Sequence, residues 1–173
     1  MANLTETQKE LMGKLYREYG LVPEDVFEHS HYKIITRQGI DKILSKSGIS
    51  FEFVDRDVQY HTYFDTKKFN SDSKYGKTVN YNGAMLKEAY NKVGAFVTVR
   101  IRGGLEGGET ISTFGESNPY NTTNEYPIAM AEKRAKSRLA LMATGLYAHG
   151  FFGEDEADDF KQSKATRTAS FKS

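Results

Sequence analysis

The sequence predicts an α+β fold, in which an antiparallel β-hairpin and one long C-terminal helix share a core and a short helix lies near the N-terminus. Residues 95–102 alternate apolar and polar side chains with the period of a strand, and a glycine-rich turn follows them. Residues 127–144 instead repeat apolar side chains with the period of a helix. The two periods, in this order, indicate a sheet packed against a helix.

Length and composition indicate one folded domain with a tail. The chain has 173 residues, of which 38% are hydrophobic, and it contains eleven Phe and eleven Tyr. This is sufficient for one domain with a hydrophobic core. We assign residues 1–153 to that domain and residues 154–173 to a disordered tail that is first acidic and then rich in Ser, Thr and Lys.

Composition also excludes several classes of function. The chain has no cysteine, which excludes disulfides, thiolate nucleophiles and Cys-ligated metal clusters. The N-terminus lacks a basic stretch followed by an apolar run, and nowhere do about 18 apolar residues follow one another. We therefore expect a cytoplasmic protein that does not enter a membrane.

The N-terminal half predicts two helices and two extended segments. Thr5 and Gln8 stand at capping-box spacing at the start of a helix over residues 5–19. An extended segment at 32–35 leads into a helix at about 38–47, which Gly48 ends. From Ile49 the apolar side chains recur at every second position, which predicts a half-buried strand.

The C-terminal half begins with a polar stretch. Residues 65–83 have no sustained period, and we expect a long loop or flexible hairpin there. Residues 103–108 form the turn of an antiparallel hairpin whose second strand lies at 109–115. In the following helix, Pro127 suits the first turn and Gly145 the C-terminal cap. Its expected buried stripe comprises Ile128, Ala131, Ala135, Leu139 and Met142.

Cations gather on the faces that these patterns leave to solvent. Arg100 and Arg102 alternate with the core residues of the strand, and four cations lie off the apolar stripe of the long helix. These four residues are Lys133, Arg134, Lys136 and Arg138. Phosphates need cations and unpaired bases need flat rings to stack on, so this set favours a nucleic-acid-binding surface. An equally simple interpretation is that they are ordinary solvated charges, in line with the net charge of only +1.

Other chemistries fit the sequence poorly. The four His are not at metal-ligand spacing, and the glycine-rich 103–108 lacks the P-loop pattern. Gly115-Glu116-Ser117 lacks the second glycine of a nucleophile elbow. The acidic residues Glu154 to Asp159 are a conceivable magnesium site for a nuclease, but a solvated charge run is the simpler interpretation. We expect no catalytic residue, metal or cofactor.

The C-terminal half resembles a known family. The run AFVTVRIRGGLEGGETISTFGESNP, a polar gap, and then YPIAMAEKRAKSRLALMATGLYAHGF are similar to the core of the Rad fifty-two superfamily of single-strand annealing proteins, in particular its phage and prophage members. The resemblance covers roughly residues 30–153 and is most specific over 95–150. It implies a curved antiparallel sheet packed on the long helix, and subunits arranged in a ring or an open helix.

The resemblance also implies where a strand is held. By position, Arg134 and Arg138 correspond to the DNA-contacting pair, with Lys133 and Lys136 as neighbours and Arg100 and Arg102 on the hairpin. This sequence departs from the family in one respect, because its helix cations lie before the apolar run 139–143. We expect the replacement of Arg134 and Arg138 to spare the fold.

The leading hypothesis is a non-enzymatic protein that binds single-stranded DNA or RNA and promotes annealing of complementary strands in recombination and repair, without nucleotide hydrolysis. It implies a homo-oligomer in the cytoplasm of a bacterium or a phage-infected host. Exposed sheet edges such as 95–102 would join the subunits. The tail would be dispensable for folding and could contact a partner protein. The alternatives are a single-strand-binding or regulatory module without annealing activity, and a metal-dependent nuclease.

Overall fold

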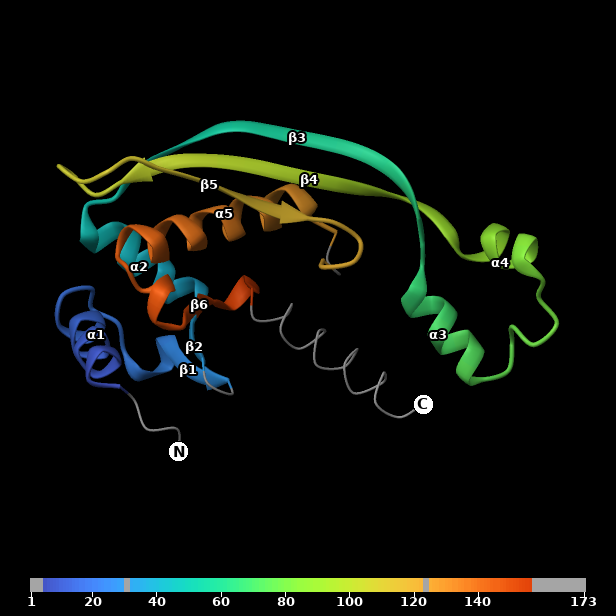
Figure 1. Cartoon of the computed structure of the whole chain (residues 1–173), viewed down its shortest axis with the longest axis horizontal. Helices are drawn as coiled ribbons and strands as arrows, with labels where there is room; N and C mark the ends of the chain where they lie inside the picture. The colour runs from blue at the N-terminus through green and yellow to red at the C-terminus, as the bar shows by residue number, and fades with distance from the viewer. Residues whose placement is uncertain (1–4, 30–31, 123–124, 157–173) are drawn as a thin grey trace.

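Helix α5 (Pro127–Ala143) is the element around which the chain is organised. In the computed structural model, which describes residues 5–29, 32–122 and 125–156, α5 lies between two three-stranded sheets. Figure 1 shows one sheet arching over α5 and the other below it. The fold is α+β with a mostly antiparallel arrangement of strands, as the sequence predicted.

The large sheet is an antiparallel meander of two long strands and one short strand. Its order is β3-β4-β5, and its strands are β3 (Ser50–Phe64), β4 (Asn91–Gly104) and β5 (Ile111–Ser117). The predicted hairpin is thus confirmed, and Val97, Val99 and Ile101 point from β4 into the core as expected. Strand β5 ends early, so β3 and β4 continue alone as a curved two-stranded arm (Figure 1).

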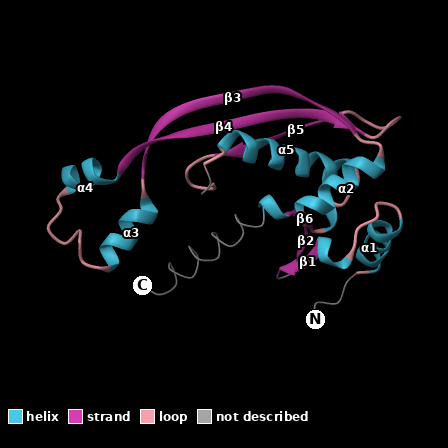
Figure 2. Cartoon of the chain, turned by 180° about the vertical axis from the view of Figure 1, so that it is seen from behind, coloured by secondary structure: helices cyan, strands magenta, loops and turns pink. Residues whose placement is uncertain are grey.

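The small sheet joins the two ends of the described chain. Its order is β1-β2-β6, in which β2 pairs antiparallel with β1 and parallel with β6. The strands are β1 (Val26–His29), β2 (Tyr32–Ile35) and β6 (Phe151–Gly153). Helices α1 (Glu6–Arg17) and α2 (Arg37–Ser47) lie beside it, as Figure 2 shows from behind. The predicted Thr5–Gln8 capping box is present, and Gly48 ends α2 with a φ of 73°.

Two apolar clusters form the core, and α5 belongs to both. Ala131, Ala135 and Leu139 pack against β4 in the cluster under the large sheet, whereas Ala140 and Leu141 pack in the cluster with α1 and α2. A helix covered on two sides needs small residues on more than one face. The predicted single stripe is therefore only partly right, because Ile128 and Met142 are each 43% exposed.

The close approach of α5 to β5 depends on Gly115. A Cβ atom at that position would lie 2.0 Å from the Ala131 carbonyl oxygen and 2.4 Å from the Ala135 amide nitrogen. Only a residue without a side chain lets the helix backbone pack directly onto the strand. This contact fixes the position of α5 under the sheet.

The expected loop at 65–83 is wrong in its first half, whereas residues 75–82 form turns and irregular backbone. Helix α3 (Thr66–Lys74) occupies its first half, and helix α4 (Gly83–Tyr90) begins at its end. Each helix begins at a side-chain cap, since Asp65 accepts from the Lys68 amide and Asn82 from the Met85 amide. The two helices stand at the far end of the β3–β4 arm (Figures 1 and 2).

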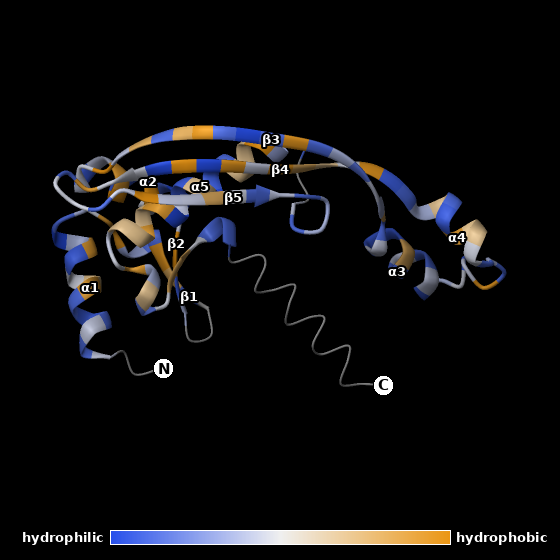
Figure 3. Ribbon diagram, turned by 45° about the horizontal axis from the view of Figure 1, so that its top comes forward, coloured by the Kyte–Doolittle hydropathy of each residue, from blue (hydrophilic) through white to orange (hydrophobic). Residues whose placement is uncertain are grey.

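The expected edges of the sheet are also wrong. Residues 95–102 lie in β4, the central strand, so the edges of the large sheet belong to β3 and β5. Strand β3 is longer and more exposed than a half-buried strand, with a bulge between Phe53 and Asp55. Figure 3 shows hydrophobic and hydrophilic residues interleaved along it. Within the described ranges no helix has the length and apolar character needed to cross a membrane.

Candidate nucleic-acid interface

The outer face of the large sheet, opposite α5, carries the first pair of predicted site residues. Strand alternation places Thr98, Arg100 and Arg102 there, because Val97, Val99 and Ile101 fill the inner face. The neighbouring strand β5 contributes Phe114 opposite Arg100 and Ser112 opposite Arg102. The predicted outward position of Arg100 and Arg102 is therefore confirmed.

These side chains surround an open depression with a volume of about 440 Å³. Its lining joins two guanidinium groups, an aromatic ring, hydroxyl groups and one apolar side chain. The lining residues are Val54, Thr98, Arg100, Arg102, Ser112, Thr113 and Phe114. We call this depression the outer-face pocket. Cations beside an exposed ring offer contacts to a phosphate and to the face of an unpaired base.

Both arginines of the pocket face carboxylates on β3. Arg102 is paired with Glu52, and Arg100 Nε lies 3.9 Å from an Asp55 oxygen. All four side chains are more than half exposed, and exposed ion pairs contribute at most about 1 kcal/mol. An incoming phosphate could therefore displace either carboxylate at little cost. The same carboxylates keep the face from being uniformly positive.

Lys133 and Lys136 lie on a different surface, the narrow stripe of α5 that remains open to solvent. Both are partly exposed, and neither has a carboxylate partner among the described residues. Their neighbour Glu132 is paired with Arg56 of β3 at 2.6 Å. Because α5 packs under the inner face, these lysines and the outer-face pocket lie on opposite sides of the sheet.

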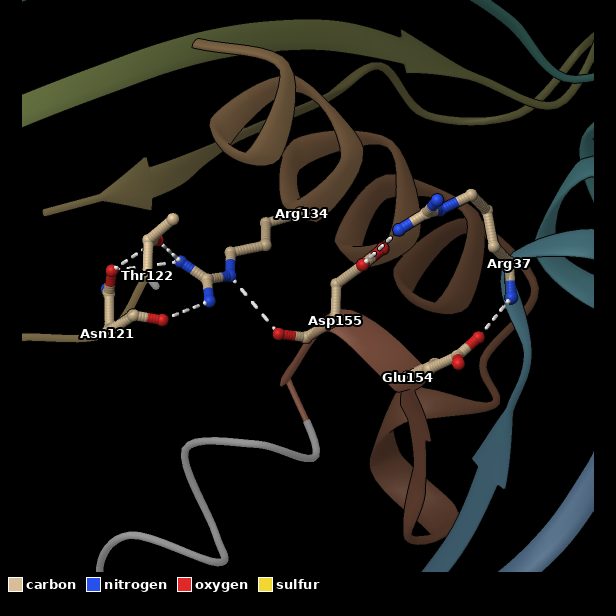
Figure 4. A network of polar contacts seen from close by, with 6 residues as sticks. All are labelled: Arg37, Asn121, Thr122, Arg134, Glu154 and Asp155. Carbon is tan, nitrogen blue, oxygen red and sulfur yellow. Dashed lines mark hydrogen bonds and ion pairs between the residues drawn. The ribbon is translucent and has the colours of Figure 1, made fainter. Parts of the chain in front are cut away.

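Arg134 does not face solvent, contrary to expectation. Its side chain is 1% exposed, and all three guanidinium nitrogens donate to internal acceptors. They reach the carbonyl oxygens of Glu116, Asn121 and Asp155 at 2.8, 2.7 and 3.2 Å, as well as the side chains of Asn121 and Thr122. Figure 4 shows this network joining α5 to the segment that follows β5.

Arg138 lies one turn further along α5 and, like Arg134, donates to a backbone carbonyl oxygen of β5. Its Nη1 donates to the Phe114 carbonyl oxygen at 2.9 Å, as Arg134 does to that of Glu116. Phe114 and Glu116 are two residues apart, so their carbonyls point the same way, out of the edge of β5. The expected row of arginines one turn apart therefore exists, but it binds the edge of β5 within the chain. Such contacts protect a sheet edge from pairing with another chain.

The acidic residues Glu154 to Glu156 are not part of a disordered tail. Asp155 and Glu156 are each 5% exposed, and they pair with Arg37 at 2.9 Å and Arg138 at 2.5 Å. Glu154 accepts from the Arg37 amide (Figure 4). The domain boundary after residue 153 is therefore wrong by at least three residues. The remainder of the predicted tail, 157–173, lies outside the described residues.

These ion pairs also weaken the magnesium hypothesis. The carboxylates of Asp155 and Glu156 already have cationic partners, and a metal ion would have to break both pairs. His61 contacts Gln59 and stacks edge-on against Phe96. In the part of the chain that the structure describes, no group of three His, Asp or Glu residues is arranged to hold a metal ion.

Phe114 and Val54 complete the outer-face pocket and were not among the predicted site residues. Alternation along β5 could have revealed Phe114, since it shares a face with Ser112 and lies opposite Arg100. Val54 follows Glu52 by two residues, so alternation along β3 places it on the same outer face. The bulge between Phe53 and Asp55 instead turns Asp55 outward, opposite Arg100, and no pattern in a single sequence reveals such a bulge.

Comparison with known proteins adds no assignment. No protein-family model matches this chain, and a search of curated proteins gives no significant match. Function must therefore be inferred from the chemistry of the site.

Proposed function

We propose that this protein binds single-stranded nucleic acid and promotes annealing of complementary strands as a homo-oligomer, without nucleotide hydrolysis. The outer-face pocket is the observation that carries the proposal. It places Arg100 and Arg102 beside the exposed ring of Phe114 on one open surface. The resemblance to the Rad fifty-two superfamily, carried by the hairpin and the long helix, supports the same function.

The chemistry of the pocket suits a strand without base-specific readout. Guanidinium groups bind phosphates, and a ring accepts any base because every base has a flat face. Bases held only by stacking remain free to sample a complementary strand. Binding should therefore be largely independent of sequence and should weaken as salt rises.

The test replaces both pocket arginines, Arg100→Gln with Arg102→Gln, and measures binding to oligodeoxythymidylate at several salt concentrations. Loss of two phosphate contacts should lower the magnitude of the slope of log K against log salt by about 1.4. At ~0.1 M salt, this corresponds to a loss of up to about 25-fold in affinity. A matched control is Lys9→Gln with Lys14→Gln, two exposed lysines of α1.

Equal losses in the two variants would mean that only overall charge matters. Unchanged binding in the arginine variant would remove the pocket from the site. An assay with complementary oligonucleotides then separates annealing from simple binding, because a protein that only covers strands would slow their pairing.

A further inference from the structure

The far end of the β3–β4 arm forms a separate cationic module, which we call the arm tip and define as residues 65–92. It contains α3, α4 and the turns between them (Figure 1). Six lysines fall in this segment against three acidic residues, Asp65, Asp72 and Glu88. The lysines are Lys67, Lys68, Lys74, Lys77, Lys87 and Lys92.

The two aspartates of the tip are used internally. Asp65 binds the Lys92 ammonium at 2.7 Å and caps α3 at the Lys68 amide. The hydrogen bond from Lys92 has the largest effect, and together with the one from the Lys68 amide it holds the pKa of the Asp65 carboxyl below its usual value. Asp72 accepts from the Tyr90 hydroxyl at 2.8 Å and lies 3.8 Å from Lys77. The carboxylates of the tip therefore do little to offset its remaining lysines.

Four lysines of the tip are exposed and form no ion pair within 4.0 Å among the described residues, although the charge of Lys68 contributes to the lowered pKa of Asp65. They are Lys67, Lys68, Lys74 and Lys87. Glu88 is the one acidic residue of the tip without such an internal role. Charges of one sign gathered at the end of an arm attract a polyanion and increase its rate of encounter.

Aromatic rings accompany these cations. Phe64, Phe69 and Tyr90 pack against one another and hold the two helices on the arm, with ring centres 5.4 to 5.7 Å apart. Tyr75, by contrast, is 72% exposed at the end of α3, next to Lys74. An exposed ring among lysines favours unpaired nucleic acid over an acidic protein segment, because bases stack on it.

We infer that the arm tip is a second contact for the nucleic-acid strand, distant from the outer-face pocket. This inference rests on the proposed function. Lys92 and Arg100 lie on the same strand, a separation of roughly 27 Å at the usual rise per residue. At about 3.4 Å per nucleotide this corresponds to about eight stacked nucleotides. A long strand reaches both contacts, and a very short one reaches only one.

The test compares short and long oligodeoxythymidylate, of about 4 and about 20 nucleotides, on the full chain and on Lys67→Gln with Lys74→Gln. Glutamine removes the charge and keeps helix propensity. For the long oligonucleotide the tip variant should lose up to about 25-fold at ~0.1 M salt, with a salt slope lower by about 1.4. The loss should exceed that of the control, Lys9→Gln with Lys14→Gln. Mass and thermal melting are recorded for each variant.

The outcomes separate the two proposals. If the tip variant loses affinity for long strands while the Arg100 and Arg102 variant does not, the tip contact stands and the pocket fails. If the tip variant binds long strands like the parent, the tip inference is overturned and the pocket is unaffected. A smaller assembly mass in the tip variant, with binding unchanged, would overturn it in favour of a contact between subunits. A parent chain that binds no oligonucleotide would overturn both.

Discussion

Arg134 is the residue whose role changes most once its surroundings are known. From its spacing it belongs to a row of solvent-facing cations, yet its guanidinium satisfies backbone carbonyls from three separate segments. Buried acceptors that lose their donor keep the cost of desolvation. The residue therefore joins α5 to these segments within the fold, and its replacement is now expected to destabilise the protein.

Arg134→Met should lower the free energy of unfolding by about 3 kcal/mol, because it leaves several buried carbonyl oxygens without a donor. Arg100→Met, at a side chain that is 69% exposed, should change the same quantity by no more than about 0.5 kcal/mol. Chemical denaturation of both variants checks this. Similar stability of the two variants would show that the Arg134 network contributes nothing.

Tyr90 makes stability depend on alkaline pH. Two effects raise the pKa of the Tyr90 hydroxyl from an ordinary value of 10.0 to about 12. The larger is the burial of the side chain, and the second is the hydrogen bond to Asp72. A raised folded-state pKa contributes stability that is fully present below pH 10 and is lost as pH rises toward 12. The hydroxyl must ionise more easily once the arm tip unfolds.

Denaturant unfolding of the parent and of Tyr90→Phe should therefore converge above pH 10. Below that pH the parent should be the more stable of the two, because only it has the Asp72 hydrogen bond. The other tyrosines titrate in both proteins, so the difference isolates Tyr90. Parallel stability profiles from neutral pH upward would contradict the assignment.

At the scale of elements, α5 and the segment 154–156 determine how the two halves of the fold meet. Helix α5 packs under the large sheet with Ala131 and Ala135 and against the N-terminal helices with Ala140 and Leu141. The segment 154–156 then fastens α5 to the start of α2 through Arg37 and Arg138. Residues that resemble a solvated acidic run are thus part of the packed structure.

Truncation after Gly153 should lower the free energy of unfolding by about 3 kcal/mol, because it removes Asp155 and Glu156 and leaves Arg138 without its carboxylate partner. Truncation after Glu156 keeps both ion pairs and should melt close to the full chain. Thermal melting of the two truncated chains provides the comparison. If both melt like the full chain, the ion pairs of this segment are not stabilising.

In the whole molecule, the long open edge of the large sheet, as far as the described residues go, is the one that β3 presents along Ser50–Phe64. The edge of β5 is partly closed by Arg134 and Arg138, and β4 is internal. Val58, Tyr60 and Val93 are 36%, 71% and 70% exposed on the arm. A long strand edge with apolar neighbours is commonly buried between subunits.

We therefore expect a multi-subunit particle in solution, and light scattering with and without oligodeoxythymidylate measures its mass. Its subunits should meet at β3, because the arginine contacts on β5 disfavour joining one sheet to the next at that edge. A strictly monomeric protein at micromolar concentration under both conditions would count against the annealing function.

Local sequence patterns were enough to predict several of the local elements. The capping box at Thr5, the alternation of 97–102 and the helix from Pro127 follow from contacts between residues close together in the chain, and the structure confirms them. Helix α3 was missed although Asp65 is an ordinary cap, because Phe69 is its one apolar residue and cannot show a helical period. Helix α4, which Asn82 caps, was not predicted because its eight residues span little more than two turns.

Which cations of α5 face solvent depends on the packing of segments that are far apart in the sequence. Arg100 and Arg102 remain outside because β4 has one covered face, which alternation predicts. The four predicted cations of α5 lie on a helix that two sheets cover, so they have different surroundings. Arg134 is buried, Arg138 contacts the edge of β5, and Lys133 and Lys136 are partly exposed to solvent. The partners of Arg134, namely Glu116, Asn121 and Asp155, lie 13 or more residues away in the sequence. Helical spacing predicts the direction in which a side chain points, but its contacts there depend on segments that are distant in the sequence.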